Sequence, residues 1–246
     1  KQLFMKPIRI AGFKKIHLGL LADILLRVLY YLMFGAMLFG AWKRDGGFQA
    51  VRASQLFAAF FAVRMLLPLA AQLLVFFGLQ EVVPISAWFA RGKKWLFLSI
   101  LAAIVNFITV TVSHTAISPA SYAGIRLSAV VYVLELVGSG LLLVCLARGM
   151  WETIYHCGGE ERVEQRLLGL EWRVWLGWTA DIVLSLLFAV SCGAVIPQLE
   201  SLGPALRSGA AVTQDDWILL AFLAVFSLVE LWRILLRAQL TIASRR

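Results

Sequence analysis

Six long apolar stretches run through this chain of 246 residues and constrain its fold more than any other feature. A bilayer core is crossed by a helix of about 20 apolar residues. Backbone groups in lipid must be hydrogen-bonded within the protein, and the alternating pattern of a membrane barrel is absent. The stretches therefore predict an all-α, polytopic bundle of six transmembrane helices. We place the spans at about 16–41, 54–80, 95–117, 126–149, 174–198 and 216–239.

The composition agrees with one membrane domain and short loops. The chain is 61% hydrophobic and 15% charged, whereas soluble domains are typically about 45–50% apolar and about 25% charged. We assign residues 16–239 to a single transmembrane domain and residues 240–246 to a cytoplasmic tail. The net charge of +9 comes from basic residues near the helix ends, which favours anionic lipid headgroups over nucleic acid as the partner.

The distribution of basic residues predicts the orientation. Fifteen Lys and Arg residues flank the spans on the side of the termini, and five lie on the opposite side. The positive-inside rule then places both termini in the cytoplasm, in a membrane that we expect to be the bacterial cytoplasmic membrane. Residues 1–15 mix apolar side chains with five cations. They predict a cytoplasmic segment that lies along the membrane surface, and the alternative is a mobile basic tail.

A weak internal repeat accompanies the spans. Residues 18–26 read LGLLADILL, residues 176–184 read LGWTADIVL, and residues 98–106 form a fainter copy. Internal repeats are common in transporters and often surround a central site. The pattern indicates that spans 1–2 and 5–6 are related helical hairpins. A threefold repeat and a chance match between apolar sequences are the alternatives.

Polar side chains inside the spans are the candidate functional residues. A charge at membrane depth costs roughly 2.5–3.5 kcal/mol on insertion scales, so it usually has a partner or a task. Asp23 and Arg27 lie four residues apart and can pair on one helix face. Arg233 can pair with Asp181 on the neighbouring helix or with Glu230 on its own. The full set is Asp23, Arg27, Arg64, Gln72, Asn106, Glu135, Asp181, Glu230 and Arg233.

Two interpretations of this polar layer remain open. Four acids face three arginines, so complete pairing leaves one acid over, and that acid could carry a proton along a proton- or cation-coupled path. The alternative is that the ion pairs only fix helix packing, since interhelical polar contacts in membranes are often worth about 0.6 kcal/mol. Pro68 predicts a kink in the second span that could serve gating, although proline is also ordinary in membrane helices.

No motif predicts an enzyme or a cofactor. The histidines show no ligand spacing, and the chain has neither a nucleotide-binding glycine motif nor a nucleophile with a paired base. His156 and Cys157 stand beside Glu160 and Glu161, but adjacent residues alone are a weak indication of a metal site. We therefore predict no cofactor, no metal and no catalytic residues.

The layout resembles that of small bacterial six-span permease subunits, including those that work with a separate ATPase. The resemblance implies that residues 1–15 and the cytoplasmic loop 81–94 meet such a partner. The first hypothesis is accordingly a transport protein or permease subunit for a small solute or ion. The second is a non-transporting scaffold or regulatory subunit of a larger membrane complex, and an intramembrane enzyme is the least favoured reading.

Overall fold

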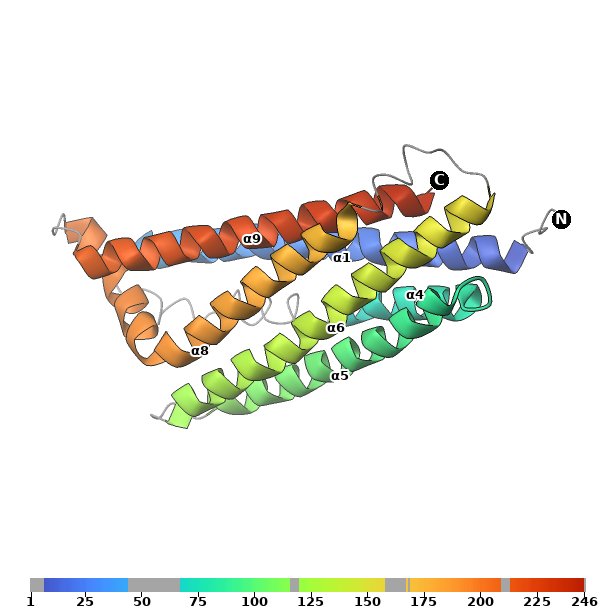
Figure 1. The fold of residues 1–246 in the computed structure, drawn as a ribbon. Coiled ribbons are helices and arrows are strands. Elements are labelled where there is room, and N and C mark those ends of the chain that lie inside the picture. The colour runs from blue at the N-terminus through green and yellow to red at the C-terminus, as the bar shows by residue number, and fades with distance from the viewer. Residues whose placement is uncertain are drawn as a thin grey trace.

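The computed structural model describes residues 7–43, 67–115, 120–157, 167, 169–208 and 213–245. Within these ranges the chain forms six helices and no strand, so the all-α prediction is confirmed for them. The helices are α1 (Pro7–Lys43), α4 (Leu67–Val82), α5 (Ala87–Thr115), α6 (Ala120–Cys157), α8 (Leu170–Ser208) and α9 (Gln214–Arg245) (Figure 1).

Five of the helices are long and apolar enough to cross a membrane. They are α1, α5, α6, α8 and α9, with candidate spans of 23 to 30 residues. The remaining helix, α4, is apolar but has only 16 residues. Residues 54–66 of the predicted second span lie outside the described part of the chain. The described helices therefore make this a multi-pass membrane protein with five spans of full length and one shorter apolar helix.

Successive helices run in alternating directions along one common axis (Figure 1). Helix α1 begins and α9 ends at the same end of the molecule, where α4 also turns into α5. Residues 7–15 of the predicted interfacial segment are helical and continue without a break into the first span. Residues 1–6 of that segment lie outside the described residues, so its position along the membrane surface stays a prediction.

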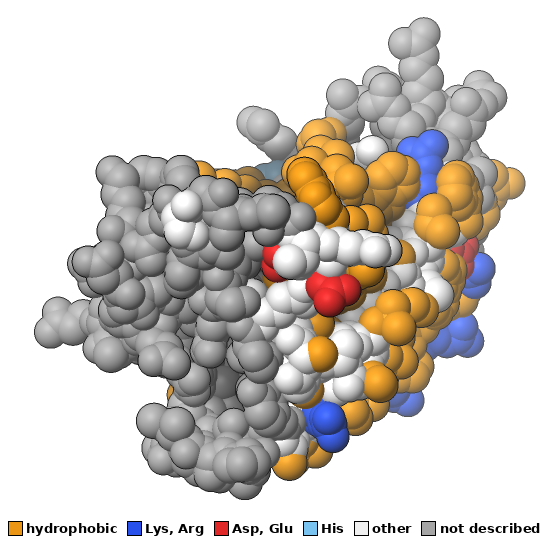
Figure 2. Space-filling model, turned by 90° about the vertical axis from the view of Figure 1, so that its left-hand side faces the viewer, with side chains coloured by type: hydrophobic (Ala, Val, Ile, Leu, Met, Phe, Trp, Pro, Cys, Tyr) orange, Lys and Arg blue, Asp and Glu red, His pale blue; other side chains and the backbone are white. Residues whose placement is uncertain are grey.

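Apolar side chains cover both the interior and much of the outer surface. Ile16, Leu79 and Leu136 are buried in the core between the helices. By contrast, Val190 is 80% exposed and Leu228 is 65% exposed, on the outward faces of α8 and α9. Hydrophobic side chains also reach the surface over much of the described part of the face in Figure 2. Soluble proteins rarely expose so much apolar surface, whereas a lipid-facing surface requires it.

Glycines allow α1 and α4 to approach closely. A Cβ on Gly19 would lie 2.6 Å from Val75 Cγ2 and 2.8 Å from the carbonyl oxygen of Ala71. In the same way, Gly12 and Gly78 leave no room for a side chain on either helix. Small residues of this kind are typical where membrane helices pack backbone to backbone.

Helices α8 and α9 meet at a corresponding glycine. A Cβ on Gly177 would lie 2.9 Å from Trp232 Cδ1 and 3.6 Å from Arg233 Cγ. Gly19 and Val75 are 56 positions apart, and so are Gly177 and Arg233. The two hairpins therefore share one helix register.

A glycine also allows close packing in the middle hairpin, between α5 and α6. A Cβ on Gly138 of α6 would lie 3.0 Å from the backbone nitrogen of Ser99 on α5. These two residues are only 39 positions apart. The middle hairpin therefore has a different register from the outer two, and a strict threefold repeat does not describe it.

Candidate functional site

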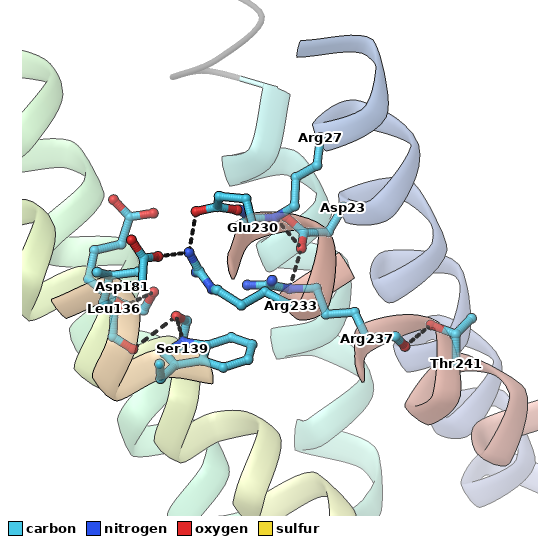
Figure 3. A network of polar contacts seen from close by, with 12 residues as sticks. Asp23, Arg27, Leu136, Ser139, Asp181, Glu230, Arg233, Arg237 and Thr241 are labelled. Atoms are coloured by element: carbon cyan, nitrogen blue, oxygen red, sulfur yellow. Dashed lines mark hydrogen bonds and ion pairs between the residues drawn. The ribbon is translucent and has the colours of Figure 1, made fainter. Parts of the chain in front are cut away.

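Helices α1, α8 and α9 bring six charged side chains together inside the bundle, here called the charged cluster (Figure 3). Its three acids face three arginines, so the formal charges of the cluster balance. Most of its side chains are at most 3% exposed. The cluster consists of Asp23 and Arg27 from α1, Asp181 from α8, and Glu230, Arg233 and Arg237 from α9.

Arg233 is the centre of one half of the cluster. Its Nη1 donates hydrogen bonds to Asp181 Oδ2 and to Glu230 Oε1. Glu230 lies three residues earlier on the same face of α9, whereas Asp181 belongs to α8. Both pairings expected from the sequence are thus present at once. Because Arg233 is 1% exposed and Asp181 is fully buried, removal of Arg233 would leave the charge of Asp181 without compensation at membrane depth.

An indole ring supports the guanidinium group of Arg233. The guanidinium carbon lies 4.6 Å from the ring centroid of Trp178, a cation–π contact. Trp178 Nε1 donates to Ser139 Oγ at 2.9 Å, and Ser139 Oγ donates to the carbonyl oxygen of Leu136 at 3.1 Å. A Cβ on Gly140 would lie 2.7 Å from the indole. Helix α6 therefore fixes the ring against which the buried arginine packs.

Asp23 is the centre of the other half. Its Oδ2 accepts a hydrogen bond from Arg27 Nε at 3.1 Å and forms an ion pair with Arg237 Nε at 2.9 Å. The pairing of Asp23 with Arg27 expected from their spacing is therefore present. Arg27 Nη1 also lies 3.8 Å from Glu230 Oε2. This contact connects the two halves of the cluster across α1 and α9 (Figure 3).

Arg237 is a cluster residue that the sequence interpretation missed. The charge distribution counts it among the fifteen cations on the side of the termini, but it is only 3% exposed. Its position four residues after Arg233 and seven after Glu230, on the same face of α9, is the signal that could have identified it. With Arg237 included, three arginines face three acids in the charged cluster. The left-over acid stays a prediction, because Arg64 lies outside the described residues.

A cavity of about 40 Å³, the first cavity, lies beside the cluster among α1, α4, α5 and α6. This space has room for a few water molecules. Asn106 is 5% exposed, and its Oδ1 accepts from Ser128 Oγ at 2.6 Å. The lining includes Arg27, Tyr30, Tyr31, Pro68, Gln72, Asn106, Tyr132 and Glu135. The cavity is therefore polar at mid-depth, and it shares Arg27 with the charged cluster.

The structure divides the predicted polar residues into two neighbouring groups. Five of them belong to the charged cluster: Asp23, Arg27, Asp181, Glu230 and Arg233. Gln72, Asn106, Glu135 and Pro68 line the first cavity. Arg64 lies outside the described residues, as does the chain before Leu67 where a kink at Pro68 would show.

The described residues contain no group of three or more His, Cys, Asp or Glu side chains able to hold a metal ion. The side chains of His156 and Cys157 lie outside the described part, and so do residues 160–161. The acids of the charged cluster are engaged by arginines, so they are not arranged as a metal site.

The turn between α4 and α5 is held firmly at the end of the molecule where α1 begins. The ring of Trp88 lies between the guanidinium carbons of Arg91 and Arg148, each 4.6 Å from its centroid. Arg148 Nη2 also lies 2.6 Å from Glu171 Oε1 of α8. This end of the bundle therefore presents a structured basic surface formed by α5 and α6.

No family model, curated protein or solved structure matches this chain. A functional assignment must therefore start from the charged cluster and the first cavity.

Proposed function

We propose that this chain is a transport protein or permease subunit that moves a small solute or ion through a polar layer in the membrane. The observation that carries the proposal is the junction of the charged cluster with the first cavity at Arg27. Intramembrane charges commonly mark substrate or ion pathways. A balanced cluster beside a polar cavity of about 40 Å³ supplies both ionic groups and space for a hydrated species.

We also propose six spans, with both termini in the cytoplasm of a bacterial cell. Support comes from the alternating helix directions and from the shared end at which α1 begins and α9 ends (Figure 1). Lys14 and Lys94 are exposed near this end, as the positive-inside rule requires of the cytoplasmic side. The second span would then comprise α4 together with residues 54–66.

The hairpins α1/α4 and α8/α9 are, in this proposal, two copies of one repeat. The matching contacts of Gly19 with Val75 and of Gly177 with Arg233 support this relation. The charged cluster lies where the two copies meet, since Asp23 comes from one and Asp181 from the other. Transporters often place their binding site between repeats in this way.

The proposal is tested by flux measurements on reconstituted protein. Vesicles containing the purified protein are loaded with potassium chloride and a mixture of amino acids, and the efflux of potassium, chloride, amino acids and protons is followed. Asp23→Asn and Asp181→Asn should each reduce the flux at least tenfold while the protein remains folded. The control is Asp215→Asn, because Asp215 is exposed at the start of α9. Undiminished flux in both cluster variants would contradict the proposal.

A scaffold or regulatory subunit is the second candidate function. It is favoured by one specific observation, namely that Asp23, Asp181 and Glu230 are all paired with arginines. A static role predicts that exchanging the charges, with Asp181→Arg and Arg233→Asp together, restores assembly lost in either single variant. A second exchange, Arg64→Glu with Glu135→Arg, should behave likewise. Restored assembly without any measurable flux would favour this function over transport.

Partners of two kinds are proposed for the cytoplasmic end. The turn around Trp88 and the basic residues near it offer a surface for a cytosolic ATPase or another membrane subunit. Anionic lipid headgroups are the second kind of partner. Purification in mild detergent followed by mass spectrometry tests the first kind, and a stoichiometric ATPase would make this chain the membrane half of a pump. We propose no enzymatic activity.

A further inference from the structure

A second cavity of about 30 Å³ lies next to the first. Together with apolar side chains, its lining includes both members of one ion pair, Asp23 and Arg237, and the hydroxyl-bearing residues Ser99 and Ser139. Arg27 and Gln72 line both cavities. The two spaces are therefore neighbours that meet at these two shared side chains.

The cavities are stacked along the helices. Helix α5 contributes Leu96 and Ser99 to the second cavity and Ala103 and Asn106, further along the helix, to the first. Helices α1, α4 and α6 contribute their lining residues in the same spatial order. Along α1 the combined lining extends over 12 residues, or roughly 18 Å at 1.5 Å per residue. This length is more than half of a hydrocarbon core about 30 Å thick.

Two buried polar atoms at the second cavity lack hydrogen-bond partners among the described residues. They are Nη1 of Arg237, a donor, and Oε1 of Gln72, an acceptor. Arg237 is only 3% exposed, so it is almost fully buried. A buried polar group without a protein partner is usually satisfied by water, which needs a water-sized polar space and two or more partners. The second cavity is large enough for water, and both residues are part of its lining.

We propose that both cavities hold water and that the species moved through the polar layer is a proton. This inference rests on the proposed transport function and names its substrate class. Cavities of about 40 and 30 Å³ are far below the 300–1,000 Å³ of sites that hold organic ligands. Each cavity also has an acid in its lining, Glu135 in the first and Asp23 in the second.

The positive charge on Arg27 does not block the movement of protons from one cavity to the other. An isolated arginine in a pore repels protons and cations. Here Asp23 Oδ2 lies 3.1 Å from Arg27 Nε, and Glu230 Oε2 lies 3.8 Å from Arg27 Nη1. Asp23 also pairs with Arg237, and Glu230 with Arg233, so the charges of the cluster balance at the junction of the cavities and leave no net positive charge to repel a proton.

Proton transfer through the water in the cavities needs no other reactant. A hydronium ion in the first cavity gives a proton to the next water, which accepts one proton and releases another along the hydrogen-bonded chain. A carboxylate that takes up a proton becomes a neutral acid and returns the same proton to water. The net result is one proton moved and no bond altered elsewhere.

The first part of the test detects the water directly. Solid-state NMR of nitrogen-15-labelled protein in lipid vesicles measures the transfer of magnetisation from water to guanidinium and side-chain amide groups. We expect transfer to Arg237 and Gln72 in the unaltered protein, and a weaker signal at Arg237 in Gln72→Met. The matched control is Gln80→Met, since Gln80 is exposed on the same helix. Absence of transfer to Arg237 in the unaltered protein would overturn the proposal whatever the protein transports.

The second part measures proton flux in vesicles that enclose a pH-sensitive dye, with a potassium gradient and valinomycin as the driving force. Gln72→Met should lower the proton flux at least tenfold, whereas Gln72→Glu, which keeps a polar group, and Gln80→Met should retain it. Efflux of chloride or amino acids without proton flux would overturn the proton assignment and leave the transport function standing. Bound water with no flux of any species would overturn the transport function as well.

Discussion

The hairpins α1/α4 and α8/α9 place a glycine opposite matching positions, and different side chains occupy those positions. Gly19 packs against Val75 in the first, and Gly177 packs against Arg233 in the second. An aspartate follows each glycine by four residues, so Asp23 and Asp181 occupy matching positions. The backbone arrangement is shared, and the side chain opposite each aspartate differs.

This difference explains how the two hairpins are joined. Asp181 finds Arg233 within its own hairpin. Asp23 has an apolar residue at the matching position, and its partners are Arg27 on its own helix and Arg237 on α9. A buried carboxylate without an opposing charge is costly. The hairpin that has no arginine opposite its aspartate is therefore joined to the other hairpin by the pair of Asp23 with Arg237.

Removal of Arg233, which is the centre of the ion pairs in the α8/α9 hairpin, should have the largest effect on stability. Arg233→Ala leaves Asp181 and Glu230 buried without their shared partner, and it should lower the free energy of unfolding by about 3–5 kcal/mol. Val75→Ala at the matching apolar position removes two methyl groups and should cost about 1–2 kcal/mol. Both values can be measured by unfolding in mixed detergent micelles. Equal losses would show that the two hairpins do not differ as described.

Substitution of the matching glycines, Gly19 and Gly177, tests the packing of the two hairpins. A Cβ on Gly19 meets backbone atoms of Ala71 and Val75 that cannot move aside, so Gly19→Ala should cost about 1–3 kcal/mol. The nearest atom to a Cβ on Gly177 belongs to the ring of Trp232, which is 41% exposed and can shift. Gly177→Ala should therefore be the milder of the two substitutions in the same unfolding measurement. The reverse order would contradict this account of helix packing.

Loss of the hydrogen bond that holds the indole of Trp178 should have a smaller effect on stability. Ser139→Ala removes the acceptor for Trp178 Nε1 and should cost about 1 kcal/mol, because a buried donor is left unsatisfied. Ser139→Thr keeps the hydroxyl and serves as the control in the unfolding measurement. A full loss of stability in Ser139→Ala would indicate a role for this serine beyond the hydrogen bond.

An ion pair near the cytoplasmic end should matter least. Lys15 and Glu81 form a bridge between α1 and α4, but the side chain of Lys15 is 43% exposed. Exposed pairs are typically worth about 0–1 kcal/mol, so Lys15→Gln should lower the free energy of unfolding by less than about 1 kcal/mol. A loss comparable to that of Arg233→Ala would remove the distinction between buried and exposed pairs in this protein.

Much of the polar cluster was predictable, because its local spacings and relative depths follow from the chain. Asp23 and Arg27, or Glu230 and Arg233, are close on any helix that contains them. The pairing of Asp181 with Arg233 needed only the assumption that consecutive helices are antiparallel neighbours. Arg237 could not be predicted in this way, because a cation near the end of a span usually contacts lipid headgroups. Only the packing of the helices buries it beside Asp23.

The sequence by itself determined the helical class, the positions of the apolar segments and the presence of charges at membrane depth. These follow from local properties, since lipid demands helices and each side chain has its own transfer energy. Only the tertiary structure decided that three helices balance six charges in one cluster, and that α1, α4, α5 and α6, with Arg237 of α9, enclose two small cavities next to it. Those features depend on the rotation and register of whole helices, which are set by close contacts such as Gly19 with Val75 and Gly140 with Trp178.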